Sequence, residues 1–264
     1  MFFVFFSIAF IASLIGAVSG LGGGIIIKPV LDMAGIAGVA EASFMSGLTV
    51  LAMTSVNIFK AIRKPKDMLI DKTRSPWLAL GAVFGGLIGN QIFDGVMTFV
   101  GAENARIVGA IQAVVLLLIT LSVMLYMLNR DKIETKNSKS FFLAVLIGLG
   151  LGVISSFLGI GGGPMNLVIL YFFFSMSTKQ AAQNSLFIIF FSQISSLIQT
   201  FVTNSVPRFN STNLIFMIIG GVSAGLIGSI LLKKLSTKTV DRLLMLVFAL
   251  VAIINIYNII KFLA

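Results

Sequence analysis

The chain has 264 residues, of which 58% are hydrophobic and only 11% charged, and its mean hydropathy is +1.07, so we predict an all-α polytopic membrane protein rather than a soluble domain. It contains no Cys and no His, which excludes disulfides, thiol catalysis and the commonest metal ligands, and we expect no metal ion and no cofactor. The net charge of +10 comes from basic residues in short loops between apolar runs, as the positive-inside rule predicts, and we expect no nucleic-acid partner.

A glycine cluster interrupts the first apolar run. We expect a membrane helix over 2–18 and not a signal peptide, because no basic segment precedes the apolar one. The cluster GLGGG at 20–24 should break this helix, and a shorter apolar segment over 25–35 follows it. The remaining membrane segments of this half are expected at 40–59, 77–93 and 107–128.

The second half repeats this plan after a charged linker. We predict a first transmembrane repeat over 1–129, a linker over 130–140 and a second repeat over 141–264. A second cluster, GIGGG at 159–163, interrupts the first apolar run of this repeat. The membrane segments are expected at 141–158, 165–174, 181–202, 214–232 and 243–260.

One offset of 139 residues relates the two halves. It maps each glycine of the first cluster onto a glycine of the second, as Gly20 onto Gly159. The same offset maps the GLIG motif at 86–89 onto the GLIG motif at 225–228. One offset for two separated motifs indicates an internal repeat. We assign the GLIG motifs to close helix packing rather than to chemistry.

Loop charges indicate that the two repeats are inverted. The loop over 60–75 carries six basic residues, whereas its counterpart over 203–213 carries only Arg208. The loop over 233–242 carries four basic residues, whereas its counterpart over 94–106 is mainly acidic. This swap predicts two inverted repeats of about five segments each, with loops 60–75, 129–140 and 233–242 in the cytoplasm and both termini outside. We expect the protein in the plasma or inner membrane, and leave open whether the broken segments cross it or re-enter.

The glycine clusters form the predicted substrate site. Broken membrane backbone survives only where it is buried in protein or lines a cavity, and a helix that restarts there presents free N–H groups and a positive dipole end to an anion. Pro164 suits the first turn of such a helix. We predict an anion site where the two breaks meet; a tightly packed helix pair without a ligand is the alternative. The expected backbone ligands are Gly22, Gly23, Gly24, Gly161, Gly162 and Gly163.

Polar side chains near the breaks complete this predicted site. Lys28 lies in an apolar run four residues after the first cluster, where it could pair with an anionic substrate or extend to the membrane interface. Asn166, Gln183 and Asn184 follow the second cluster and are selected as ligands, although amides and hydroxyls also serve plain interhelical hydrogen bonds. The polar residues of this half that we considered but did not select are Ser155, Ser156, Gln193 and Gln199.

No constellation typical of an enzyme is visible, so we predict that the protein is not an enzyme. The absence of His and of a phosphate-binding loop argues against a hydrolase and against an ATP-driven pump within this chain. Asp32 and Glu41 are the acidic residues close to a break. We interpret both as outward-loop charges, which leaves proton coupling with little support.

With these motifs, the chain resembles the sulfite exporter TauE/SafE family of membrane transporters. The shared features are its length, the duplicated halves, the charged central linker and the Gly-x-Gly-Gly-Gly cluster early in each half, with Pro29 after the first. The second half departs from this pattern, because Pro164 follows the glycines directly and Val168 stands at the position spaced like Pro29. The resemblance implies a secondary carrier of sulfite, sulfoacetate or another small organosulfonate.

We therefore predict a secondary transporter, acting as an exporter, that moves a small anion by alternating access. An anion channel with the same pore lining is the alternative, and a membrane enzyme or scaffold is a weaker one. The expected partners are the anionic substrate and the lipid bilayer. Coupling to protons or another ion and assembly as a homo-oligomer stay open.

Overall fold

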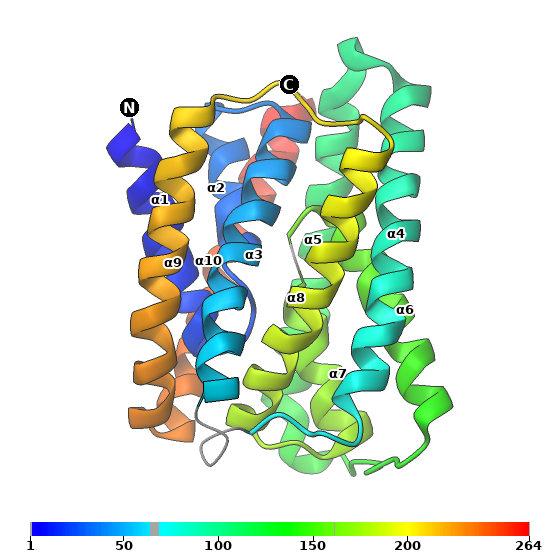
Figure 1. Cartoon of the computed structure of the whole chain (residues 1–264), viewed down its shortest axis with the longest axis vertical. Coiled ribbons are helices and arrows are strands. Elements are labelled where there is room, and N and C mark those ends of the chain that lie inside the picture. The colour runs from blue at the N-terminus through cyan, green and yellow to red at the C-terminus, as the bar shows by residue number, and fades with distance from the viewer. Residues whose placement is uncertain (1, 64–68, 161, 264) are drawn as a thin grey trace.

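The computed structural model describes residues 2–63, 69–160 and 162–263, in which ten α-helices pack side by side (Figure 1). The first five are α1 (Phe2–Ser19), α2 (Gly24–Ala34), α3 (Val39–Arg63), α4 (Ser75–Val100) and α5 (Ala105–Asn129). The second five are α6 (Phe141–Leu158), α7 (Pro164–Phe174), α8 (Thr178–Val202), α9 (Ser211–Lys234) and α10 (Thr237–Leu263). Two short 3-10 helices, η2 (Ala102–Asn104) and η3 (Arg130–Lys132), flank α5.

Eight of these helices are long and apolar enough to cross a membrane. This confirms the prediction of an all-α polytopic membrane protein. The other two helices of the described residues, α2 and α7, have 11 residues each. At about 1.5 Å per residue they reach only about half of the ~30 Å hydrocarbon core.

Each half-length helix runs back to the face at which the preceding helix begins (Figure 1). The chain enters at the upper end with α1 and returns there with α2, whereas α6 begins at the lower end and α7 returns there. Hydrogen bonds agree with this course. Lys261 near the end of α10 donates to the Met33 carbonyl at 2.9 Å, and Arg74 beside the start of α4 donates to the Phe174 carbonyl at 3.1 Å. These directions are the ones that an inverted repeat requires, while the repeat relation itself stays a prediction.

The two ends of the bundle differ in charge. The end here called the basic face carries the loops 69–74, 133–140, 175–177 and 235–236; the opposite face carries 35–38, 101–104 and 203–210. The described basic residues near the basic face are Lys60, Arg63, Lys72, Arg74, Arg130, Lys132, Lys136, Lys139, Lys179, Lys233, Lys234, Lys238 and Arg242. Those near the opposite face are Arg106, Arg208 and Lys261. The asymmetry that the loop charges predicted is therefore present in three dimensions.

The glycine clusters break both helices, as predicted. Gly22 has φ +73° and Gly159 has φ +64°, a left-handed backbone that other residues rarely adopt. The two breaks also touch each other, because a Cβ at Gly24 would overlap the carbonyl group of Ile160. Glycine at position 24 thus lets the two interruptions meet inside the bundle.

The GLIG motifs serve helix packing, as predicted. A Cβ at Gly86 would lie 2.9 Å from the carbonyl oxygen of Ser192, and a Cβ at Gly225 would lie 2.9 Å from that of Met53. These two contacts are reciprocal, since the 139-residue offset maps Gly86 onto Gly225 and Met53 onto Ser192. Thus α4 meets α8 as α9 meets α3, which is the pairing expected for two halves related by a two-fold axis.

Candidate functional site

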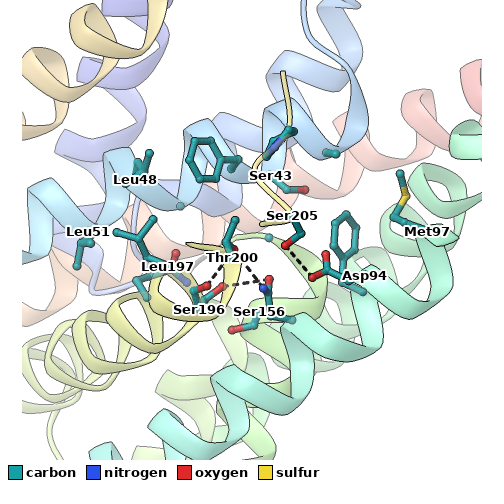
Figure 2. A pocket seen from close by; sticks show the side chains of 18 of the residues that line it. Ser43, Leu48, Leu51, Asp94, Met97, Ser156, Ser196, Leu197, Thr200 and Ser205 are labelled. Carbon is teal, nitrogen blue, oxygen red and sulfur yellow. Dashed lines mark hydrogen bonds between the residues drawn. The ribbon is translucent and has the colours of Figure 1, made fainter. Parts of the chain in front are cut away.

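A cavity of about 300 Å³ connects the opposite face with the second helix break. Its walls come from α3, α4 and α8, and its mouth from the end of α4 and the 203–210 loop (Figure 2). Ser156 and Gly159, at the end of α6, close its deep end. The cavity therefore leads from the surface to the point at which the backbone of α6 stops being helical.

A hydrogen-bond network forms one wall of this cavity. Asn90 of α4 donates through Nδ2 to Thr200 Oγ1 at 3.1 Å, and Ser196 Oγ donates to Asn90 Oδ1 at 3.3 Å (Figure 2). Both partners of Asn90 belong to α8. The network joins the two helices and leaves a polar surface toward the cavity.

Two side chains of the lining are buried without a hydrogen-bond partner among the described residues. Ser156 is 5% exposed and Gln193 is 6% exposed, and neither the Ser156 hydroxyl nor the Gln193 amide is paired. Leaving a buried polar group unpaired costs about 1–3 kcal/mol, so both groups favour a polar ligand or water in the cavity. Gly47 gives the amide its room, because a Cβ there would lie 2.7 Å from Gln193 Oε1.

Asp94 is the charged side chain at this site. No other ionisable residue lines the cavity in the part of the chain that the structure describes. Its carboxylate accepts a hydrogen bond from Ser205 Oγ at 3.0 Å at the mouth (Figure 2). An anion inside the cavity would thus be held by neutral donors and not by Lys or Arg. Between residues 2 and 263, with the gaps noted above, no three acidic side chains gather into a metal-binding group.

The glycines of the predicted site lie beside this cavity and not in its lining, apart from the neighbouring Gly159. Gly162 and Gly163 border a separate cavity of about 10 Å³, which has room for about one water molecule. Gly22, Gly23 and Gly24 pack against α1 and the second break. Gly161 lies outside the described residues. The structure thus brings the breaks together while the starts of α2 and α7 stay outside the 300 Å³ cavity.

Lys28 has an ionic partner within its own helix. Its Nζ lies 2.8 Å from Oδ2 of Asp32, and the two side chains are only 4% and 6% exposed. The interpretation of Asp32 as an outward-loop charge is therefore wrong, because α2 continues to Ala34 and buries this carboxylate one turn after Lys28. Lys261 of α10 donates to the Asp32 carbonyl at 3.0 Å and covers the end of α2.

Gln183 and Asn184 bind the chain segment before α4. Gln183 Oε1 accepts from the Leu69 N–H at 2.8 Å, and Asn184 Oδ1 accepts from the Asp71 N–H at 2.8 Å. Asn184 Nδ2 donates to the Leu69 carbonyl at 3.0 Å, and Ser75 Oγ donates to Asn184 Oδ1. These two predicted ligands therefore lie near the basic face, with their amides engaged by backbone, and away from the 300 Å³ cavity.

Asn166 is close to the second break but also outside the large cavity. Its Nδ2 donates to Ser185 Oγ at 3.3 Å, and the side chain borders the 10 Å³ cavity. Sequence reasoning considered Ser156 and Gln193 without selecting them. Nearly every position of α6 and α8 is apolar or small, so the sequence carries no signal for the helix face that turns toward a cavity.

Comparisons with known proteins point in one direction. A family model described as sulfite exporter TauE/SafE matches residues 5–254. The "Probable membrane transporter protein YunE" of Bacillus subtilis (strain 168) is 23% identical over 279 aligned residues, which cover 97% of this chain and 98% of that protein. No solved structure matches. Both matches extend over almost the whole chain, and both names describe membrane transport.

Proposed function

Because the chain belongs to the sulfite exporter TauE/SafE family, as its motifs predicted, we propose that it exports a small anion such as sulfite, sulfoacetate or another organosulfonate by alternating access. The family and the name of the relative indicate a membrane transporter and not an enzyme. The substrate, the direction of transport and the mechanism are the parts that we propose.

The observation that carries this proposal is the cavity that ends at the second helix break. Its volume of about 300 Å³ is at the small end of the range of about 300–1,000 Å³ for ligand pockets, which suits a small anion. The Ser156 hydroxyl and the Gln193 amide are the free donors at its deep end. Hydrogen bonds to a charged group contribute about 1.5–3 kcal/mol each, so two of them bind an anion without holding it too tightly for release.

Asp94 supports a coupling step at the mouth of the same cavity. A negative carboxylate there repels an entering anion, and a proton on this group removes the repulsion. We therefore propose that proton movement and anion movement are linked through Asp94. The reading of the acidic residues as uninvolved charges applied to Asp32 and Glu41 and did not consider this position as part of a cavity.

The proposed transporter is built from two inverted repeats, 1–129 and 141–264. The reciprocal glycine contacts and the opposite directions of α1–α2 and α6–α7 support this relation. By the positive-inside rule, the basic face with loops 60–75, 129–140 and 233–242 lies in the cytoplasm of a cell whose plasma or inner membrane holds the protein. The cavity is then open to the outside.

An open anion channel is less well supported than a carrier. A channel needs a continuous route between both faces, whereas this cavity ends at Ser156 and Gly159. Alternating access requires such a one-sided opening in any single state.

Flux into proteoliposomes tests the proposed function. We expect uptake of labelled sulfite, sulfate or a C2 sulfonate, and a change of rate when a pH gradient is imposed. Gln193→Leu should lower the rate at least about tenfold by removing a donor to the anion. Gln199→Leu, in the same helix but outside the cavity lining, is the matched control. Failure of every tested anion to cross would refute the transporter assignment.

A further inference from the structure

A small cavity of about 30 Å³ lies near the basic face. Six of its seven lining positions map, at the 139-residue offset, onto residues that line the 300 Å³ cavity. Ile58 thus corresponds to Leu197, and Leu232 corresponds to Phe93. The other pairs are Asn57 with Ser196, Ala61 with Thr200, Gln183 with Phe44 and Leu186 with Gly47. The two cavities occupy equivalent places in the two halves, one open and one closed.

The chain segments that cover the two cavities also correspond. Residues 69–74, here called the inner strap, precede α4, and their counterparts at 208–213 follow the 203–207 residues and lead into α9. Ile70 of the inner strap lines the small cavity and corresponds to Phe209. The Phe209 ring lies 5.2 Å from that of Phe44, which lines the large cavity.

The two straps are held by different chemistry. Gln183 and Asn184 bind the inner strap through its own backbone, with Leu69 N–H to Gln183 Oε1 and Asp71 N–H to Asn184 Oδ1 both at 2.8 Å. The position equivalent to Gln183 is Phe44, which offers a ring contact and no hydrogen bond to the other strap. Directional bonds close one side, while a slack aromatic contact leaves the other open.

Lys60 adds a second closure beneath the small cavity. Its Nζ donates to the Leu226 carbonyl at 2.7 Å and to Ser229 Oγ at 2.9 Å, which ties the end of α3 to α9. Both helices border the 30 Å³ cavity, so this contact restrains its walls from the side of the basic face.

We propose that the 30 Å³ cavity is the closed inner vestibule of the substrate route, and that Gln183 and Asn184 are the latch that keeps the inner strap over it. The inference rests on the proposed transport function and adds the half of the route that faces the cytoplasm. When the latch opens, the substrate passes Asn57 and Ile58 toward the basic face. The predicted ligands Gln183 and Asn184 thereby act in transport as gate residues and not as contacts of the bound anion.

Thiol labelling tests this gate, and the chain has no natural Cys to interfere. Ile58→Cys and Leu197→Cys are a matched pair at equivalent positions. In lipid nanodiscs, a bulky water-soluble maleimide should label Leu197→Cys readily and Ile58→Cys slowly. Adding Gln183→Leu should raise the rate at Ile58→Cys about three- to tenfold, the effect of one lost hydrogen bond, while the rate at Leu197→Cys stays equal or falls. Gln199→Leu should change neither rate.

A second variant covers the case in which Gln183→Leu does not fold. Leu69→Pro removes the same hydrogen bond from the strap, in a loop outside the helices. It should raise the labelling rate at Ile58→Cys in the same way. Unchanged labelling of Ile58→Cys, or equal acceleration at both cysteines, overturns the latch. Labelling needs no substrate, so failure of every anion in the flux assay refutes the proposed function separately.

Discussion

At the scale of single residues, Gly47 decides how the Gln193 amide sits in the large cavity. A Cβ at this position would lie 2.7 Å from Gln193 Oε1, so Gly47→Ala must displace the end of that flexible side chain. We expect a folded protein whose KM for the transported anion rises about three- to tenfold, since one hydrogen bond to a charged group weakens. Gly150→Ala is the control, because a Cβ there meets no atom within 4 Å. Equal kinetics of both variants would contradict the role of Gln193.

The buried ion pair in α2 gives a second prediction at this scale. Lys28→Met leaves the Asp32 carboxylate buried without its partner, which should destabilise the protein by about 3–5 kcal/mol. The double variant Lys28→Met with Asp32→Leu removes both charges and should regain much of that loss. Thermal unfolding in detergent measures both effects. A double variant that loses the sum of the two single effects would show that the two charges do not stabilise each other.

At the scale of the helices, the contact between the two breaks is the feature to test. Gly24→Ala puts a Cβ into the Ile160 carbonyl group, and backbone on both sides cannot yield as a side chain can. We expect a loss of about 3 kcal/mol or more, seen as lower folded yield and a lower Tm. Gly95→Ala in α4 meets nothing within 4 Å and should behave like the natural protein. A normal Tm for Gly24→Ala would mean that the breaks do not touch.

The apolar runs predicted every helix of the described chain, but not their ends. α4 was expected to stop at Phe93 before a charge, yet it continues to Val100 and carries Asp94 inside it. Hydropathy marks the part of a helix that lies in hydrocarbon, while helical backbone continues into the polar interface, where charges are tolerated. The same limit explains the wrong interpretation of Asp32.

The site was only partly predictable for a different reason. The glycine spacing predicted the two breaks and their approach, because a break is a local property of the backbone. Which donors face a cavity depends on how α6 and α8 rotate against their neighbours, and their nearly uniform apolar pattern does not encode that rotation. Gln183 and Gln193 are chemically alike in sequence, yet one binds a strap at the basic face and the other faces the cavity.

At the scale of the whole molecule, the orientation in the membrane follows from the basic face. Single cysteines at Lys72 and Lys238, both exposed there, should react with an impermeant thiol reagent only from the cytoplasmic side. A cysteine at Glu103, exposed on the opposite face, should react only from outside. Ser75 is less suitable as a reporter, because it is buried beside Asn184. Labelling of Lys72→Cys and Lys238→Cys from different sides would refute the inverted arrangement.

The one-sided cavity makes the molecule a carrier that reorients around a small anion, and counterflow tests this most directly. Proteoliposomes are loaded with an unlabelled anion that the flux assay has identified as a substrate, and the uptake of the labelled anion is followed from outside. A carrier predicts faster uptake into loaded vesicles than into empty ones, because a bound anion must return with each cycle. Gln193→Leu should lose this acceleration, and Gln199→Leu should keep it. Uptake that is fast but independent of the internal anion would contradict alternating access and indicate a channel.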